Sequence, residues 1–102
     1  MSALSDMYIE LSPKEYETRL NWNDAKLYCQ LLNIDDKMDW RLPTIRELSE
    51  ISDNPTVLDD TCYWSSDHYN DGLACLFYPV KKTEYYNNNN LKYHVRPIRT
   101  VE

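Results

Sequence analysis

The first strong hydrophobic pattern in the chain has the period of an α-helix. Within residues 21–33, four side chains recur at steps of three, four and three: Trp22, Ala25, Cys29 and Leu32. This spacing places them on one face of a helix, because an α-helix repeats every 3.6 residues or so. Asn21 or Asn23 is available as the N-cap, and Asn33 as the C-terminal stop. The pattern predicts a helix that buries this face.

A second, shorter helix is predicted to begin after Thr44. Thr44 and Glu47 have the spacing of a capping box, in which the hydroxyl accepts from one backbone amide and the carboxylate accepts from the other. Pro43 prevents the helix from extending backwards, because its ring disfavours helical geometry at the preceding residue. The buried stripe consists of apolar residues: Ile45, Leu48 and Ile51. The Asp-Asn-Pro segment at 53–55 ends the helix.

The rest of the chain has the period and composition of β-strands. Residues 7–11 alternate as a first strand, and residues 12–20 form a polar connection or a short turn. After the second helix, three aromatic and β-branched segments have strand length: 62–67, 72–80 and 92–101. Polar segments separate them: 68–72 and 81–90. Helices in the first half and antiparallel strands in the second predict an α+β fold, since a parallel sheet would need alternating strands and helices.

The composition indicates one globular domain that keeps many aromatic rings near water. A chain of 102 residues is too short to divide its buried surface between two cores, so residues 1–102 are expected to form a single domain. Nine Tyr against one Phe indicate that most rings carry a hydroxyl that reaches water or a hydrogen-bond partner. Gly72 is the only glycine, so Asn and Asp are expected at turns with positive φ.

The charge and the N-terminal sequence exclude several classes of partner. Eleven basic against seventeen acidic residues give a net charge of −6, which repels nucleic acid and anionic membranes. No stretch reaches the roughly 18 apolar residues of a membrane span. The first sixteen residues lack the basic and apolar regions of a signal peptide. We therefore expect a soluble, cytoplasmic protein that binds neither nucleic acid nor membrane.

The chain shows no pattern typical of a metal centre or a catalytic site. Three widely spaced cysteines form no CxxC pair, and each is expected to be a buried free thiol, which suits a reducing compartment: Cys29, Cys62 and Cys75. Calcium would need about six to eight converging oxygens. Four aspartates follow no recognisable calcium loop and are interpreted as solvated: Asp59, Asp60, Asp67 and Asp71. We expect no metal, no cofactor and no enzymatic activity.

Four sequence blocks occur in the order and spacing of a known family: 21–29 (NWNDAKLYC), 39–48 (DWRLPTIREL), 63–66 (YWSS) and 95–99 (VRPIR). Over residues 8–99 they resemble the Legionella collagen-like protein C-terminal domain family, and more distantly the formylglycine-generating enzyme and sulfatase-modifying-factor group. The resemblance implies a C-type-lectin-like fold with two helices packed on small twisted antiparallel sheets. It also implies termini that lie close together, and a long irregular segment that presents a ligand surface, as in surface binding modules and adhesins.

The resemblance implies mainly structural roles for the residues that match the family: Trp22, Cys29, Trp40, Arg41, Pro43, Glu47, Trp64, Arg96 and Arg99. Pro97 stands where many relatives carry a cysteine between the two terminal arginines, which argues against an exported, disulfide-linked form. The formylglycine-generating chemistry needs two reactive cysteines close together at a copper site. Cys62 and Cys75 flank the 63–66 block and do not form the expected pair.

The charged residues of these blocks are expected to form ion pairs. A half-buried guanidinium is tolerated mainly when a carboxylate pairs with its planar donors. We hypothesise that Glu47 or Asp39 pairs with Arg96 or Arg41 and ties the 39–48 block to the last strand. The alternative is an anion-binding site at these arginines.

The candidate binding surface consists of two loops, 67–71 and 81–94, that are rich in Tyr and Asn. Rigid rings supply contact area and amides supply hydrogen bonds, as in antibody paratopes. The candidate residues are His68, Tyr69, Tyr85, Tyr86, Asn87, Asn88 and Tyr93. The alternative is a flexible hairpin whose Asn and Tyr reflect an AT-rich genome. We predict a non-enzymatic module that binds a protein partner, consistent with a phage- or mobile-element-encoded interaction or inhibitor protein. Carbohydrate binding is the alternative, and self-association stays open.

Overall fold

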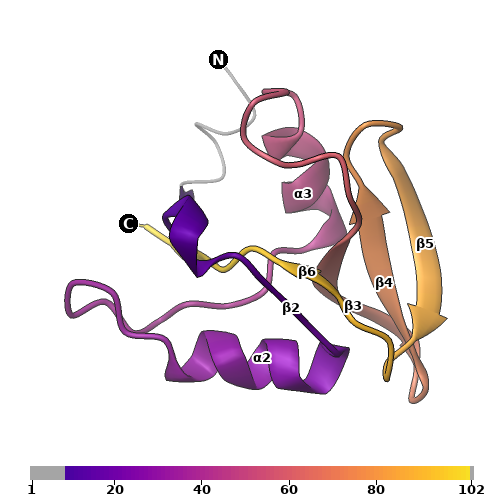
Figure 1. Ribbon diagram of the computed structural model, residues 1–102, viewed down its shortest axis with the longest axis horizontal. Helices are drawn as coiled ribbons and strands as arrows, with labels where there is room; N and C mark the ends of the chain where they lie inside the picture. The colour runs from indigo at the N-terminus through magenta and orange to yellow at the C-terminus, as the bar shows by residue number, and fades with distance from the viewer. Residues whose placement is uncertain (1–8, 102) are drawn as a thin grey trace.

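The two helices pack on opposite faces of a five-stranded sheet in the computed structural model, which describes residues 9–101 (Figure 1). The elements are β1 (Ile9–Leu11), the 3-10 helix η1 (Lys14–Tyr16), β2 (Thr18–Leu20), α2 (Trp22–Leu31), α3 (Ile45–Ile51), β3 (Tyr63–Asn70), β4 (Leu73–Tyr78), β5 (Thr83–Asn88), β6 (Tyr93–Val95) and β7 (Ile98–Thr100). This is an α+β fold, as predicted. None of the described helices is long and apolar enough to cross a membrane.

The large sheet has the strand order β2-β6-β3-β4-β5, so β5 is an outer strand. Its pairs are antiparallel except for one parallel bridge between Tyr63 and His94. A separate two-stranded sheet pairs β1 with β7, with Ile9 opposite Thr100. The two ends of the described chain therefore lie side by side, as the family resemblance implies.

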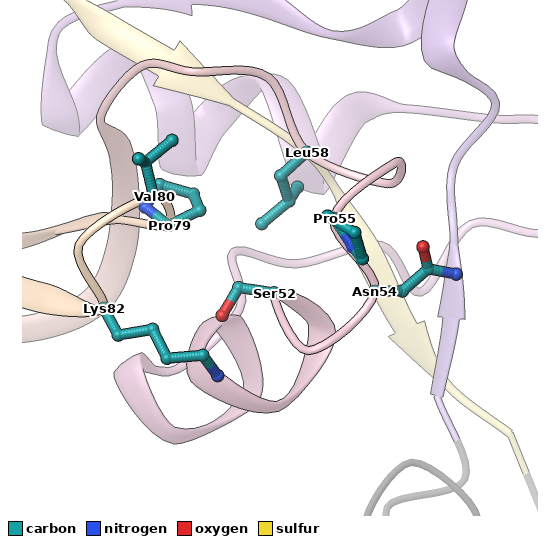
Figure 2. Close-up of a pocket in the computed structure, with 7 residues that line it drawn as sticks. All are labelled: Ser52, Asn54, Pro55, Leu58, Pro79, Val80 and Lys82. Atoms are coloured by element: carbon teal, nitrogen blue, oxygen red, sulfur yellow. The ribbon is translucent and has the colours of Figure 1, made fainter.

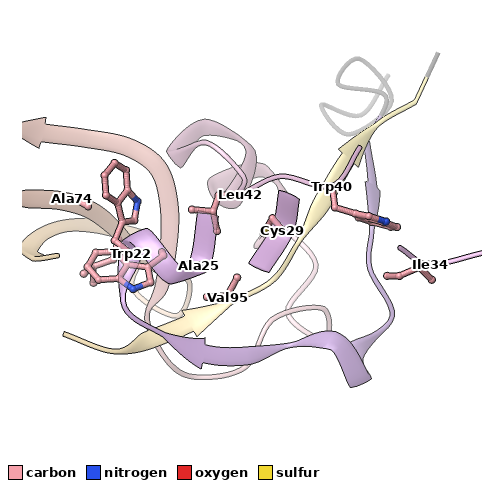
Figure 3. Close-up of a cluster of buried hydrophobic side chains, with 10 residues drawn as sticks. Trp22, Ala25, Cys29, Ile34, Trp40, Leu42, Ala74 and Val95 are labelled. Atoms are coloured by element: carbon pink, nitrogen blue, oxygen red, sulfur yellow. The ribbon is translucent and has the colours of Figure 1, made fainter. Parts of the chain in front are cut away.

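The sheet separates two hydrophobic clusters because neighbouring strand residues point to opposite faces. On the α2 side, the cluster contains Trp64 of β3 with residues of α2, of the segment between α2 and α3, and of β4 and β6 (Figure 3): Trp22, Ala25, Cys29, Ile34, Trp40, Leu42, Ala74, Leu76 and Val95. On the α3 side, the adjacent Tyr63 packs in the second cluster: Leu48, Ile51, Leu58, Phe77 and Ile98. Each helix thus buries its predicted apolar stripe on one side of the sheet.

Both helices begin where their capping residues predict. The Asn21 side chain accepts a hydrogen bond from the Asp24 amide at 2.9 Å, and α2 follows. At α3 the capping box is complete: Thr44 Oγ1 accepts from the Glu47 amide at 3.1 Å, and Glu47 Oε1 accepts from the Thr44 amide at 2.8 Å. Pro43 is fully buried, and its carbonyl accepts from the Ser66 amide at 2.8 Å, which joins the start of α3 to β3.

The strand prediction is wrong in four places. The predicted polar segment 68–72 begins inside β3, which extends to Asn70. The interpretation of 12–20 as a connection missed β2, and the interpretation of 81–90 as a loop missed β5. The predicted strand 92–101 is divided into β6 and β7 by Arg96 and Pro97, which lie in neither. The predicted start of the first strand at residues 7 and 8 lies outside the described residues.

Positive φ angles fall only partly where the sequence predicts them. Among residues 9–101 they occur at Asp35 and Asp36, as expected for aspartate, and also at Lys82. Lys82 lies in the β4–β5 turn and was not expected to adopt this conformation.

Candidate binding surface

The seven candidate binding residues lie on strands, which corrects the prediction that they form loops. His68 and Tyr69 belong to β3, and Tyr93 belongs to β6. The tyrosines and asparagines at 85–88 belong to β5, which pairs with β4 at six successive positions. The irregular segment implied by the family resemblance is therefore a regular outer strand in this chain.

The strand register divides the candidate residues between the two faces of the sheet. Directly opposite residues of an antiparallel pair point to the same face. Tyr85 lies opposite Leu76, and both Asn87 and His68 lie opposite Ala74, so these three point to the α2 face. Tyr86 lies opposite Cys75 and points to the α3 face.

On the α2 face, the candidates Tyr93 and Asn87 help to pack the core. The Tyr93 ring packs edge-on against Trp64, with 5.1 Å between ring centroids. Asn87 Nδ2 donates to the Tyr93 hydroxyl at 2.7 Å. The His68 ring lies 5.6 Å from the Trp22 ring. Tyr93 and Asn87 are thus held by structural contacts, whereas Tyr85 remains exposed.

On the α3 face, Tyr69 and Tyr86 form an exposed pair. Their ring centroids are 5.0 Å apart with an angle of 49° between the planes, and the residues are 66% and 51% exposed. The nearby Glu84 carboxylate raises the pKa of Tyr86. Asn88 Oδ1 accepts from the Asn90 amide at 2.8 Å and orders the following turn. We call Tyr69, Tyr85 and Tyr86 the tyrosine edge, since Tyr85 and Tyr86 lie on the outer strand β5 and Tyr69 contacts Tyr86 from β3.

The 39–48 block contains the predicted ion pair between Glu47 and Arg41. The two terminal guanidinium nitrogens of Arg41 each donate to one carboxylate oxygen of Glu47, both at 2.8 Å. Burial alone would raise the pKa of Glu47, but Arg41 and the Thr44 amide outweigh it and leave the pKa below its ordinary value. Arg41 also donates to Thr100 Oγ1 at 3.0 Å, and its backbone pairs with that of Ile98. The block is therefore tied to β7, as hypothesised.

The other arginine pairs differ from the hypothesis. Arg96 does not pair with Glu47 or Asp39; it lies 3.6 Å from Glu17 and donates to the Ser12 carbonyl at 2.9 Å. Asp39 instead pairs with Arg99 at 2.7 Å, and this contact lowers the pKa of Asp39. No local pattern marked Glu17, which lies 79 positions before Arg96 and reaches it only in the folded chain.

All three tryptophans are buried, and each indole donates to a backbone carbonyl. The acceptors are Ser65 for Trp22 at 2.8 Å, Lys37 for Trp40 at 2.9 Å, and Leu20 for Trp64 at 2.9 Å. Such pairing is the usual condition for burying an indole N–H. No tryptophan of the chain is therefore exposed as a binding platform.

The cysteines are free thiols with raised pKa values. Cys29 and Cys75 are buried, as predicted, whereas Cys62 is only partly buried. Burial raises the pKa of Cys29 to about 12 and raises those of Cys62 and Cys75. A nucleophilic cysteine needs the opposite shift. Among residues 9–101, no three His, Cys, Asp or Glu side chains are grouped to hold a metal ion.

Two clefts were not anticipated by the sequence analysis. One of about 300 Å³ lies between the segment after α3 and the β4–β5 turn (Figure 2): Ser52, Asn54, Pro55, Leu58, Pro79, Val80 and Lys82. Lys82 lies along one side of it and donates to Asp53 and to the Ser49 carbonyl. The other cleft, of about 220 Å³, is lined by residues of α2, the 39–48 block and β3: Lys26, Gln30, Trp40, Arg41, Leu42 and Ser66. Both combine segments that are distant in the sequence, so local sequence carries no signal for them.

The Glu47–Arg41 pair predicts an acid-dependent loss of stability. Because the folded-state pKa of Glu47 lies below its ordinary value of 4.5, the pair stabilises the fold fully above that pH. The stabilisation is lost as the pH falls through the folded-state pKa. Urea denaturation of the wild type and of Glu47→Gln should show a difference in unfolding free energy at pH 7 that shrinks below pH 4.5. A difference that is independent of pH would contradict this assignment.

The arrangement of helices and sheets identifies the class of protein to which this chain belongs. Two helices flank a small twisted sheet, a second small sheet joins the ends, and an outer strand carries exposed aromatic side chains. This is the arrangement of a C-type-lectin-like domain. The chain also matches the family model described as the Lcl C-terminal domain over residues 6–99. It therefore belongs to this family, as the four sequence blocks indicate. No curated protein matches the chain.

Proposed function

We propose that the domain is a non-enzymatic module that binds a protein partner through the tyrosine edge. The observation that carries the proposal is the exposure of Tyr85 and Tyr86 on an outer strand whose neighbour β4 is buried, together with the exposed Tyr69 that contacts Tyr86. Tyrosines are enriched in protein interfaces because a rigid ring supplies apolar area and a hydroxyl supplies a hydrogen bond. A partner that runs along β5 contacts side chains of both faces, as strand-edge recognition requires.

The protonated thiols favour a binding function over a catalytic one. They also favour a location in a reducing compartment. Burial holds the thiols of Cys29, Cys62 and Cys75 protonated, so none has the activation of a catalytic nucleophile. Free thiols persist in reducing compartments. We propose a cytoplasmic location on this basis.

The double variant Tyr85→Ala/Tyr86→Ala should lose partner binding by at least about tenfold, since buried interface tyrosines contribute on the order of 1 to 2 kcal/mol each. The measurement is a quantitative pull-down from the native host, with the immobilised domain at nanomolar concentration. The matched control is Leu27→Ala/Leu31→Ala, which removes two exposed side chains from α2. Binding that survives in the tyrosine variant, or that is lost equally in the control, places the interface elsewhere.

Carbohydrate binding is the second candidate, favoured by the exposed Tyr69–Tyr86 pair. Sugars stack on aromatic platforms, and with every tryptophan buried this pair would have to supply the platform. A glycan array distinguishes the two functions. Hits that are lost in Tyr69→Ala support the sugar, whereas an array without hits together with a captured protein supports the protein partner.

A further inference from the structure

β5 is the longer of the two outer strands of the large sheet. The two outer strands of the large sheet are β2, with three residues, and β5, with six. The pairing of β5 with β4 has no register shift, whereas that of β3 with β4 has two. β5 also contains no proline or glycine. Such an edge offers a regular row of N–H and C=O groups to a further strand, and most proteins interrupt it.

The geometry points to a second copy of this chain as that strand, paired antiparallel about a twofold axis. Only alternate residues direct their N–H and C=O groups to the open edge. In a symmetric pair, opposite residues must therefore both have odd numbers or both have even numbers. Axes near the middle of β5 place Glu84, Tyr85 or Tyr86 opposite its own copy. The register centred on Glu84 is unfavourable because it places two carboxylates opposite each other. The registers centred on Tyr85 and on Tyr86 remain.

Charge complementarity favours the register centred on Tyr85. Lys81 lies in the exposed turn before β5. Asp71 lies in the β3–β4 turn beyond the other end, where its carbonyl accepts from Asn89 Nδ2 at 2.9 Å. With Tyr85 on the axis, Lys81 of one copy lies opposite Asn89 of the second copy. The basic turn of each copy then lies beside the acidic turn of the other, which offsets the repulsion between two chains of net charge −6.

The pairing extends the sheet across both copies and brings their tyrosine edges together. Opposite Tyr85 residues form a cross-strand aromatic pair, a favourable contact in antiparallel sheets. The Tyr69–Tyr86 pairs of the two copies lie on the same face of the extended sheet. The dimer therefore carries two equivalent aromatic pairs, and its pairing competes with a partner strand for the open edge of β5. Because so short a strand pair buries little area, we expect a dissociation constant of about 0.1 mM.

Sedimentation equilibrium of the purified chain tests the pairing. The mass should equal 12.2 kDa at low micromolar concentration and approach twice that value at about 1 mM. Tyr85→Lys places like charges on the axis and should weaken the dimer at least about tenfold. Leu31→Lys introduces the same charge at a residue of α2 that is 74% exposed, and should leave the dimer unchanged. Thermal unfolding should show both variants folded.

Hydrogen–deuterium exchange provides a test that needs no variant. Amides of β5 should exchange more slowly as the concentration of the wild type increases, while amides of α2 should not change. A mass of 12.2 kDa up to about 1 mM, or a dimer that Tyr85→Lys leaves intact, would overturn the inference. These measurements use the chain alone, whereas the pull-down uses nanomolar chain and a foreign partner. Failure of the pairing and failure of the proposed function are therefore distinguishable.

Discussion

Replacing Trp64 with alanine should lower the free energy of unfolding by about 4 kcal/mol. The indole is completely buried, donates to the Leu20 carbonyl at 2.9 Å and packs against the Tyr93 ring. The substitution leaves a cavity in the α2-side cluster and a carbonyl of β2 without its donor. Domains of this size have roughly 5 to 15 kcal/mol of stability, so the variant should be close to unfolding.

Urea denaturation and thermal unfolding measure this effect, and a graded series identifies its origin. Trp64→Phe keeps a ring in the core but removes the donor, so about half of the loss is expected. Leu27→Ala changes an exposed side chain of α2 and should change the stability by less than about 0.5 kcal/mol. A loss below about 1 kcal/mol for Trp64→Ala would be incompatible with the buried position of the indole.

The helices could be predicted because their signals are local. The Asn21 cap, the Thr44–Glu47 capping box and the apolar stripes lie within a few residues of the structure they determine. β2 could not be predicted in this way, since its three residues pair with β6, more than seventy positions later. β5 lacks the alternation of apolar and polar residues because it is exposed on both faces.

The candidate surface could be predicted in composition but not in geometry. The sequence correctly placed Tyr69, Tyr85 and Tyr86 among exposed residues. It could not assign them to faces, because two register shifts between β3 and β4 change which β3 side chains share a face. The contact of Asn87 with Tyr93 could not be foreseen either, because it depends on the pairing of β5 with β4 and of β6 with β2 and β3. The type of a side chain is a local property of the sequence. The face of the sheet to which it points depends on the register of strands that meet only in the folded chain.

Glu47→Gln is expected to lower the free energy of unfolding by about 2 kcal/mol. Breaking a fully buried ion pair costs about 3 to 5 kcal/mol, but Arg41 is partly solvated, with 37% of its side chain exposed, which reduces the loss. Glutamine keeps the volume and an oxygen that can accept from the Thr44 amide. The loss of unfolding free energy therefore measures the contribution of the charge pair and of its contact with β7. It does not measure the contribution of the helix cap. Urea denaturation at pH 7 measures it.

Glu50→Gln is the matched control, because Glu50 lies on the same helix but pairs with Arg46, whose side chain is 80% exposed. Its effect should stay within about 0.5 kcal/mol. Equal losses in the two variants would contradict the special role of Glu47. Combining Glu47→Gln with Arg41→Met should cost less than the sum of the single changes, since no charge is then left without a partner. That non-additivity would show that the 39–48 block stabilises the fold through this pair.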